Sequence, residues 1–225
     1  ICFLNSFANP ANEKFVADLL AAELPDVFLC TSFEVAPVIR EYHRASTTAV
    51  NAYAMPVAQP YLARLSARLQ DEGFSQSPLI MLSSGGVVGA DVAGRNPVRM
   101  IESGPAAGAL AASYFSERLG LERIIAFDMG GTTAKACLIE NHAPLVTGEF
   151  EVDRRYRFKH GSGIPVTVPS IDMIEIGAGG GSIAHLDKLG LLKVGPHSAG
   201  SVPGPACYGR GGSAPTVTDA NLVLG

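Results

Sequence analysis

An acidic residue stands at the end of an apolar, strand-forming run and is followed closely by glycine and hydroxyl residues. The run Ile124–Phe127 ends at Asp128, and after Met129 come Gly130, Gly131, Thr132 and Thr133. Backbone N–H groups in such a turn can form an anion-binding nest, to which threonine hydroxyls add donors. A carboxylate at the strand end can hold magnesium, usually through water. The spacing therefore favours a phosphate-binding turn, with Asp128 as the candidate metal ligand.

Two other phosphate motifs are excluded by the residues after the turn. A P-loop needs a lysine directly after glycine and then a helix, whereas Lys135 comes after Ala134, and residues 134–139 alternate like a strand. The missing helix also excludes the dinucleotide fingerprint. A plain hairpin with a Gly-Gly turn stays open as the alternative. The acid favours the phosphate-binding turn, because a carboxylate at the end of a buried apolar strand is costly unless it is paired or coordinated.

A second glycine-rich loop has a similar composition. Four of the five residues 177–181 are glycine, so either another group approaches this backbone closely or the chain turns sharply. Two acids precede the loop, Asp172 and Glu175, and a carboxylate of this pair is a candidate general base or metal neighbour. A flexible glycine hinge is the alternative, although apolar residues flank the loop on both sides. The candidate ligand-binding residues are Gly177, Gly179, Gly180, Gly181 and Ser182.

Other reactive residue types have simpler structural interpretations. Asp219 stands where a helix cap is expected, just after Thr216. Cys207 has no histidine base near it in the sequence and is interpreted as a packing residue. His185 and His197 have no second histidine at ligand spacing, which argues against a zinc site. A basic cluster, interpreted as a solvated face or as a salt-bridge partner for another subunit, comprises Arg154, Arg155, Arg157, Lys159 and His160.

Strands and helices interleave along the chain, which predicts the α/β class. Pro56 and Pro60 are expected to separate two helices. Residues 123–140 read as strand, turn and strand, and a β-rich section continues to about residue 176. Ten glycines and prolines within residues 195–215 argue against regular structure there. The periodicity predicts helices over 10–24, 40–54, 57–71, 103–119 and 220–224, and buried strands over 27–30 and 79–82.

The bulk composition limits the classes of function. Only 17% of the 225 residues are charged, against about 25% in ordinary soluble domains, so we expect missing chain or a partner to cover part of the surface. The net charge of −4 argues against a nucleic acid or an anionic membrane as partner. Four widely spaced cysteines fit buried free thiols in a reducing compartment, which predicts the cytoplasm. No apolar run approaches the ~18 residues of a membrane span, and both ends read as cuts through a longer polypeptide.

Several of these stretches resemble one protein family. D-M-G-G-T-T-A-K, I-E-I-G-A-G-G-G-S-I-A and P-G-P-A-C-Y-G-R-G-G-S-A-P-T-V-T-D-A-N-L-V-L-G are similar to the A subunits of the hydantoinase/oxoprolinase family. Upstream, E-V-A-P-V-I-R-E-Y-H-R-A-S-T-T-A-V-N-A-Y and E-S-G-P-A-A-G-A resemble the same family. The resemblance covers essentially the whole chain. It assigns residues 1–78 to the C-terminal part of the family's N-terminal region and residues 79–225 to the N-terminal part of its hydantoinase A domain.

The resemblance implies an actin-like ATPase fold of the ribonuclease H-like type, present in part, with mixed sheets flanked by helices. It also implies ATP-dependent opening of a cyclic amide such as a hydantoin or 5-oxoproline, with ATP and Mg²⁺ as cofactors and a B-type partner subunit. In that fold two β-turn-β loops clamp the nucleotide, and residues 128–133 match the second. The first loop, an acid followed by Gly-Gly-Thr, has no match here. We therefore expect weak or no ATP binding by this chain alone.

The implied reaction assigns roles to the candidate residues. Phosphorylation of the amide oxygen opens the carbon to attack by water, so catalysis needs positioning and charge neutralisation. Under this hypothesis the 130–133 turn holds phosphates, Asp128 orders magnesium, and the 177–182 loop contacts nucleotide or substrate. The sequence departs from the family at Lys135, where many members carry an acid, and this lysine either reaches a phosphate or points to solvent. Three alternatives stay open: a subunit of an ATP-dependent ketone carboxylase, a small-molecule kinase of the same fold, and a non-catalytic nucleotide-binding scaffold.

Overall fold

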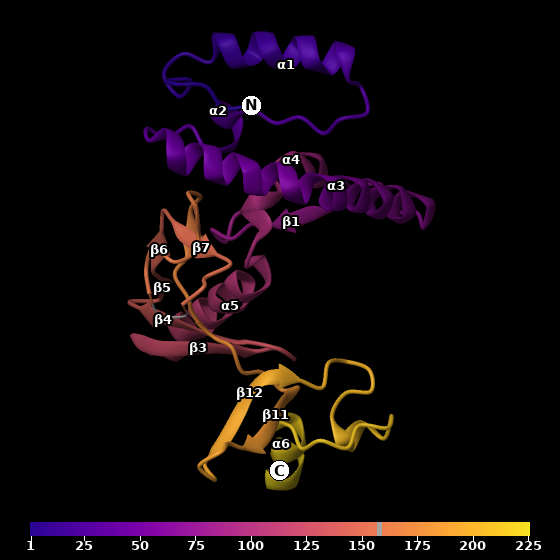
Figure 1. Cartoon of the computed structure of the whole chain (residues 1–225), viewed down its shortest axis with the longest axis vertical. Coiled ribbons are helices and arrows are strands. Elements are labelled where there is room, and N and C mark those ends of the chain that lie inside the picture. The colour runs from indigo at the N-terminus through magenta and orange to yellow at the C-terminus, as the bar shows by residue number, and fades with distance from the viewer. Residues whose placement is uncertain (157–158) are drawn as a thin grey trace. The chain divides into compact units, whose positions relative to one another are not determined.

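A computed structural model describes residues 1–156 and 159–225 (Figure 1). Arg157 of the basic cluster lies outside the described residues. The chain has a mixed α/β arrangement, with most helices before residue 120 and most strands after it. The helices are α1 (Ala11–Glu23), α2 (Ser32–Val35), α3 (Glu41–Asp71), α4 (Ala90–Arg95), α5 (Ser103–Leu119) and α6 (Val217–Leu224), with 3₁₀ turns η1 (Pro97–Met100) and η2 (Ala206–Tyr208). The strands are β1 (Leu79–Met81), β2 (Val87–Gly89), β3 (Arg123–Met129), β4 (Ala134–Glu140), β5 (Ala143–Pro144), β6 (Val146–Thr147), β7 (Phe150–Val152), β8 (Ile164–Val166), β9 (Ser170–Ile171), β10 (Ile174–Ile176), β11 (Ser182–Leu186) and β12 (Leu192–Ser198).

The chain divides into two compact units. The first comprises residues 1–107 and 146–171, and the second comprises residues 108–145 and 172–225. The boundary predicted between residues 78 and 79 stays a prediction, because regions of a family sequence and compact units in space are different divisions. Every candidate site residue lies in the second unit.

The two helices predicted over 40–54 and 57–71 are one helix, so this prediction is wrong. Helix α3 runs from Glu41 to Asp71 with Pro56 and Pro60 inside it. A proline removes one hydrogen bond of the helix and tends to kink it, but tertiary contacts hold α3 on both sides of residue 56. After the proline, Leu62 packs in a buried cluster with Ala90 and Ala93. Asn51 donates through Nδ2 to Arg95 O at 3.0 Å, and its Oδ1 accepts from the N–H of Val98 at 3.2 Å.

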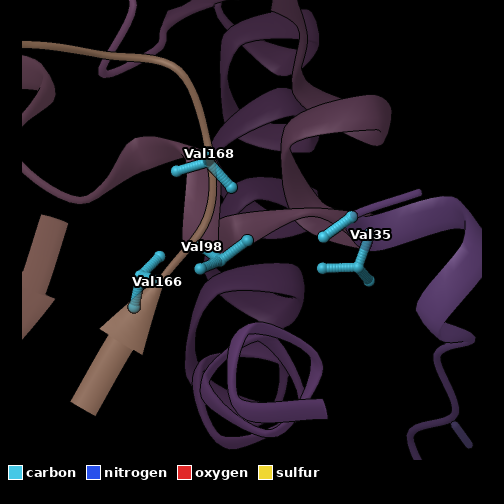
Figure 2. Packing of buried hydrophobic residues seen from close by; sticks show 5 residues of the cluster. Val35, Val98, Val166 and Val168 are labelled. Carbon is cyan, nitrogen blue, oxygen red and sulfur yellow. The ribbon is translucent and has the colours of Figure 1, made fainter. Parts of the chain in front are cut away.

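The core of the first unit is a cluster of small branched side chains. Figure 2 shows Val35 and Val98, from two separate segments, near Val166 and Val168 of a third segment. None of the four is more than 1% exposed. Because β-branched side chains have few rotamers, they fill such a core at low cost in conformational entropy.

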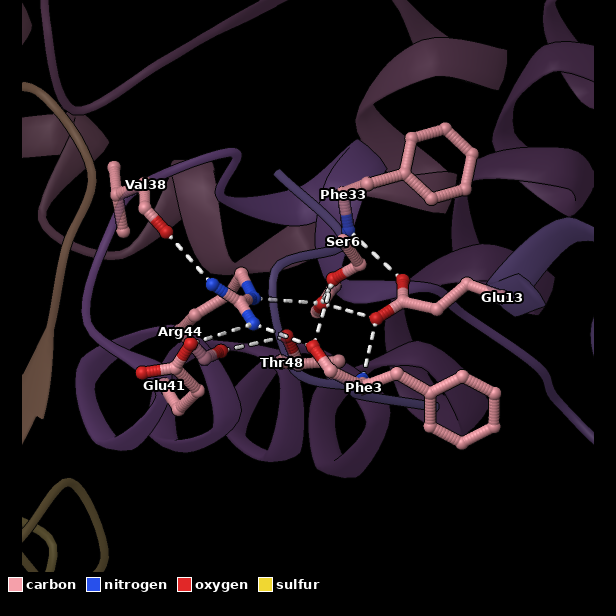
Figure 3. Close-up of polar contacts among 9 residues, drawn as sticks. Phe3, Ser6, Glu13, Phe33, Val38, Glu41, Arg44 and Thr48 are labelled. Atoms are coloured by element: carbon pink, nitrogen blue, oxygen red, sulfur yellow. Dashed lines mark hydrogen bonds and ion pairs between the residues drawn. The ribbon is translucent and has the colours of Figure 1, made fainter. Parts of the chain in front are cut away.

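A buried carboxylate lies beside the start of the chain in the same unit (Figure 3). Glu13 is fully buried; its Oε1 accepts from Phe3 N at 2.7 Å and Ser32 Oγ at 2.6 Å, and its Oε2 accepts from Phe33 N at 3.1 Å. Burial raises the pKa of Glu13, but these hydrogen bonds and one with Ser6 outweigh it, so the pKa lies below its ordinary value of 4.5.

A buried guanidinium completes this network (Figure 3). Arg44 is 0% exposed and donates through Nε to Ser32 Oγ at 3.0 Å, through Nη1 to Val38 O at 2.9 Å and through Nη2 to Phe3 O at 2.6 Å. Ser32 therefore lies between the buried acid and the buried base. This arrangement ties residues 1–6, α1 and α2 to α3.

The second unit is built around an antiparallel sheet. Its strand order is β10-β4-β3, with β5 also paired to β4. The hairpin β11-β12 and helix α6 lie together (Figure 1). The predicted strand–turn–strand over 123–140 and the helix over 103–119 are confirmed.

Three local predictions are corrected. Residues 27–30 form no strand; the N-terminal amino group of Ile1 instead donates to Cys30 O at 2.8 Å. The strand over 79–82 exists, but Leu79 is 69% exposed rather than buried. Part of 195–215 is regular, because β12 extends to Ser198. Among the described residues, no helix has both the length and the apolar character that crossing a bilayer requires.

Candidate functional site

The stretch of acid, glycines and threonines forms the tip of the β3–β4 hairpin. The two strands pair in register from Arg123 opposite Glu140 to Met129 opposite Ala134. The N–H of Gly130 donates to Thr133 O at 2.9 Å, which closes a four-residue turn. Because β4 is a strand and not a helix, the exclusion of a P-loop is confirmed.

Free backbone donors are exposed at this turn. Gly130, Gly131 and Thr132 are exposed and Thr133 is half-buried. Within the part of the chain that the structure describes, the N–H groups of Gly131 and Thr132 have no hydrogen-bond acceptor. Neighbouring unpaired amides of this kind form a site for an anion. The predicted anion-binding nest therefore loses one of its donors, because the N–H of Gly130 is already hydrogen-bonded to Thr133 O within the turn.

The second glycine-rich loop packs directly against the first turn. The N–H of Gly180 donates to Gly130 O at 2.9 Å, and the N–H of Gly181 donates to Gly131 O at 2.7 Å. A Cβ at position 179 would lie 2.6 Å from the carbonyl carbon of Thr132. The close approach that the glycines suggested is therefore made by the 130–133 turn itself.

The described bonds of residues 177–182 indicate a fixed support rather than a free hinge. Gly179, Gly181 and Ser182 are buried, whereas Gly177 is exposed. Ser182 Oγ accepts from the N–H of Gly179 at 2.9 Å. Consequently the amides of Gly179, Gly180 and Gly181 are engaged within the chain.

A lysine lies between two acids across the sheet. The strand register places Asp128 opposite Lys135 on one side and Glu175 opposite Lys135 on the other. Opposite residues of antiparallel strands share a face, and Lys135 Nζ lies 3.9 Å from Glu175 Oε1. Asp128 is exposed, so the argument from a buried carboxylate does not apply to it. Lys135 instead lies opposite both acids in the strand register.

Asp172 precedes β10 and lies near a buried thiol. Its N–H donates to Leu145 O at 2.8 Å and its side chain is exposed. Burial raises the pKa of the Cys137 thiol, and the negative charge of Asp172 adds to this effect. The described residues contain no group of three or more His, Cys, Asp and Glu side chains arranged for a metal. Magnesium commonly uses only one or two carboxylates, with phosphate and water as further ligands, and Asp128 beside the exposed turn fits that role.

Helix α6 supplies a contact that the sequence did not indicate. A cap is present as expected, but the capping residue is Thr216 and the helix begins at Val217 rather than at 220, so Asp219 lies inside the first turn and completes a capping box. Two residues into this motif, Thr218 donates through both its N–H and its Oγ1 to Gly180 O, each at 2.9 Å. Nothing in the sequence separates this hydroxyl from an ordinary residue of a helix start.

The exposed thiol of the motif is also held by Asp219. The N–H of Cys207 donates to Asp219 Oδ1 at 2.7 Å, and hydrogen bonding to this carboxylate raises the pKa of the Cys207 thiol. The four cysteines are free thiols, but only Cys137 is buried, so the expectation of buried thiols holds for that residue alone. The interpretation of Cys207 as a packing residue is wrong, because it is exposed.

The comparison with known families settles the relationship of this chain. Residues 44–225 match the family described as hydantoinase/oxoprolinase. The chain belongs to the hydantoinase/oxoprolinase family. The predicted mixed α/β class, with the actin-like ATPase type of fold found in this family, is confirmed.

Individual members show the same relationship along the whole chain. The chain is 48% identical over 228 residues to an uncharacterized protein of Methanocaldococcus jannaschii and 43% identical over 225 residues to the caprolactamase subunit alpha of Pseudomonas jessenii; each match covers 100% of this chain, but only 34% and 31% of those proteins. A nucleotide-free structure of acetone carboxylase, titled for ATP-dependent acetone carboxylation, aligns with a TM-score of 0.77 at 28% identity, over 100% of this chain and 31% of that one. The chain thus spans about a third of the length of these relatives.

Proposed function

We propose that this chain is the nucleotide-binding part of an ATP-dependent enzyme that opens a cyclic amide. The observation that carries the proposal is the exposed turn beside Asp128, where the N–H groups of Gly131 and Thr132 have no acceptor within the described part of the chain. A turn used only to reverse a hairpin needs no buried second loop to hold its carbonyls. The hydrogen bonds from Gly180 and Gly181 to the carbonyls of the turn fix the direction of its N–H groups. This fixed direction supports a turn that binds an anion.

The site residues divide into ligands and supports under this proposal. The N–H groups of Gly131 and Thr132, with the hydroxyls of Thr132 and Thr133, bind phosphate oxygens of ATP. Asp128 orders Mg²⁺ through water. Gly177, which is exposed, is left to contact nucleotide or substrate, whereas the supports are Gly130, Gly179, Gly180, Gly181 and Ser182. When bound, ATP supplies the phosphoryl group that activates the amide oxygen.

The row of charges across the sheet supports a second role. Lys135 lies 3.9 Å from Glu175 and directly across from Asp128, so it offsets carboxylate charge that would otherwise repel a triphosphate. We assign Lys135 to charge balance, with direct contact to a phosphate as the second possibility. Asp172 or Glu175 acts as general base for the attacking water.

The substrate class and the partner are inferred from the relatives. The caprolactamase subunit alpha is a subunit of an enzyme named for a lactam, which is a cyclic amide. We propose a lactam, hydantoin or 5-oxoproline ring as substrate and a B-type subunit as partner. Because its four cysteines are free thiols, we place the protein in the reducing cytoplasm.

Carboxylation is the second candidate, and one observation favours it. The backbone is more similar to that of acetone carboxylase, with a TM-score of 0.77, than to that of the caprolactamase of Pseudomonas jessenii in its crystal structure, with a TM-score of 0.71. The sequence, however, is more similar to the caprolactamase, at 41% identity, than to acetone carboxylase, at 28% identity. Side chains rather than backbone decide the chemistry of a site. Sequence identity is therefore a better guide to the reaction than backbone similarity, and cyclic amide opening remains the main proposal.

The role of Asp128 is tested in the full-length enzyme together with its partner subunit. Because Asp128→Ala removes the carboxylate that orders magnesium, we expect ATP turnover to fall by about 100-fold or more. Glu140→Ala is the matched control, since Glu140 is an exposed acid at the other end of the same hairpin. Phosphate release is measured for both variants. Unchanged ATP turnover in Asp128→Ala would contradict the role of Asp128 in ordering magnesium.

Product analysis separates the remaining functions. A cyclic amide panel with ATP should give ring-opened amide plus free phosphate. A stable phosphate ester would indicate a kinase, and bicarbonate-dependent carboxylate formation from a ketone would indicate the carboxylase alternative. If titration detects no ATP binding with or without the partner, only a structural role is left.

A further inference from the structure

Two amides of the turn, the N–H groups of Gly131 and Thr132, have no acceptor among residues 1–156 and 159–225, and each is the last member of a chain of hydrogen-bonded peptide groups. The N–H of Ser182 donates to Gly179 O at 3.0 Å, and the N–H of the same peptide group, which belongs to Gly180, donates to Gly130 O at 2.9 Å. The peptide group that carries Gly130 O ends in the N–H of Gly131, which has no acceptor among the described residues. Peptide groups linked in this way polarise one another and fix each other's direction.

The second chain begins outside both loops, at helix α6. Thr218 donates twice to Gly180 O, the N–H of the same peptide belongs to Gly181, and this N–H donates to Gly131 O at 2.7 Å. The peptide that carries Gly131 O ends in the unpaired N–H of Thr132. Two donors at one end are thus linked through two peptide groups to an exposed donor at the other.

The position of Thr218 strengthens this link. It lies in the first turn of α6, whose N-terminus carries partial positive charge. That charge faces the Gly180 carbonyl and polarises the chain in the direction that makes the N–H of Thr132 a better donor to an anion. The fit is close, because a Cβ at position 180 would lie 2.7 Å from Thr218 Oγ1.

We propose that Thr218 is a positioning residue for the anion-binding turn, acting on the N–H of Thr132 through the peptide between Gly180 and Gly181. Thr218 itself does not contact the nucleotide. The inference rests on the proposed function in one respect, that the anion bound at the turn is a phosphate of ATP.

The test compares Thr218→Val with Thr218→Ser in the full-length protein. Valine keeps the shape and the backbone N–H but removes the hydroxyl donor, whereas serine keeps the donor. We expect Thr218→Val to raise the Kd and KM for ATP by roughly five- to tenfold, the effect of one hydrogen bond, with a smaller change in kcat. Thr218→Ser should stay within about twofold of wild type.

Hydrogen exchange of the nucleotide-free protein supplies a readout that does not depend on ATP. In Thr218→Val, the amides of Gly180 and Gly181 should exchange faster than in wild type and in Thr218→Ser. Unchanged exchange overturns the inference, and so does faster exchange with unchanged ATP affinity. Failure of wild type to bind ATP would end the proposed function, while the exchange comparison still decides whether Thr218 holds the loop.

A second variant covers the case in which Thr218→Val does not fold. Gly180→Ala introduces a Cβ that displaces the Thr218 hydroxyl and should give the same exchange and affinity changes. Gly180→Ala combined with Thr218→Ala removes the clash without restoring the donor. The inference requires that this double variant still bind ATP more weakly than wild type. Recovery of wild-type ATP affinity would show that the steric clash alone, and not the lost hydrogen bond, weakened binding.

Discussion

Single buried side chains decide how the first unit responds to pH. Glu13 is fully buried and accepts three hydrogen bonds at 3.1 Å or less, two from backbone N–H groups and one from Ser32. Its folded-state pKa is depressed below 4.5. A depressed carboxyl pKa contributes stability that is present above the unfolded pKa and is lost as pH falls through the folded pKa.

Replacing this carboxylate should change both stability and its pH dependence. Because Glu13→Gln loses charge-assisted hydrogen bonds, we expect the free energy of unfolding at pH 7 to fall by about 1.5–3 kcal/mol. Wild type should lose stability below about pH 4.5, and Glu13→Gln should lose less over the same interval. Denaturant unfolding at a series of pH values measures both. Glu23→Gln, an exposed glutamate of the same helix, should change neither, and an equal pH slope in Glu13→Gln would contradict the assignment.

At the scale of elements, the two glycine-rich segments have different physical reasons for glycine. Gly179 is buried against the backbone of the 130–133 turn, where a Cβ would lie 2.6–2.7 Å from three backbone atoms. Gly131 has open space at its Cβ position and is exposed. Packing therefore explains the first glycine, and room for a ligand explains the second.

Two alanine substitutions separate these reasons. Gly179→Ala should destabilise the protein by about 1–3 kcal/mol, because backbone atoms must move apart. Gly131→Ala should leave the melting temperature nearly unchanged and weaken ATP binding, because a methyl group then stands where the phosphate approaches. Thermal unfolding and ATP titration of the full-length variants give both numbers. A destabilised Gly131→Ala, or a Gly179→Ala of wild-type stability, would contradict this division.

At the scale of the whole molecule, one face of the sheet in the second unit exposes several large apolar side chains. Ile125, Phe127, Leu138 and Ile174 are 70%, 58%, 45% and 65% exposed, and the strand register puts them on the same face. An apolar face of this kind marks an interaction surface. It agrees with the low charge content of the sequence and with a chain that spans about a third of its relatives.

The polypeptide 1–225 should therefore differ from a full-length family member that contains it. Only one of the two phosphate loops implied by the family resemblance has a match here, so we expect ATP to bind 1–225 alone at least about 100-fold more weakly. The exposed sheet face should also bind an apolar dye more strongly than the full-length protein does. Calorimetric titration and dye fluorescence of both proteins test this, and equal ATP affinity would show that the 130–133 turn suffices.

Sequence alone determined the strand–turn–strand at 123–140, the helix at 103–119 and a helix cap within 216–219, because each of these depends on residues close together in the chain. It also determined the family, because the family is recognised by short sequence motifs. Tertiary structure decided what local patterns cannot encode. Tertiary contacts of Asn51 and Leu62 hold α3 on the two sides of Pro56, and Asp128 is exposed although its strand is apolar. The register of β10, β4 and β3 places Lys135 between two acids. Above all, the packing of residues 179–181 against the 130–133 turn fixes which amides stay available to an anion, since a hydrogen bond between distant segments exists only once both are folded.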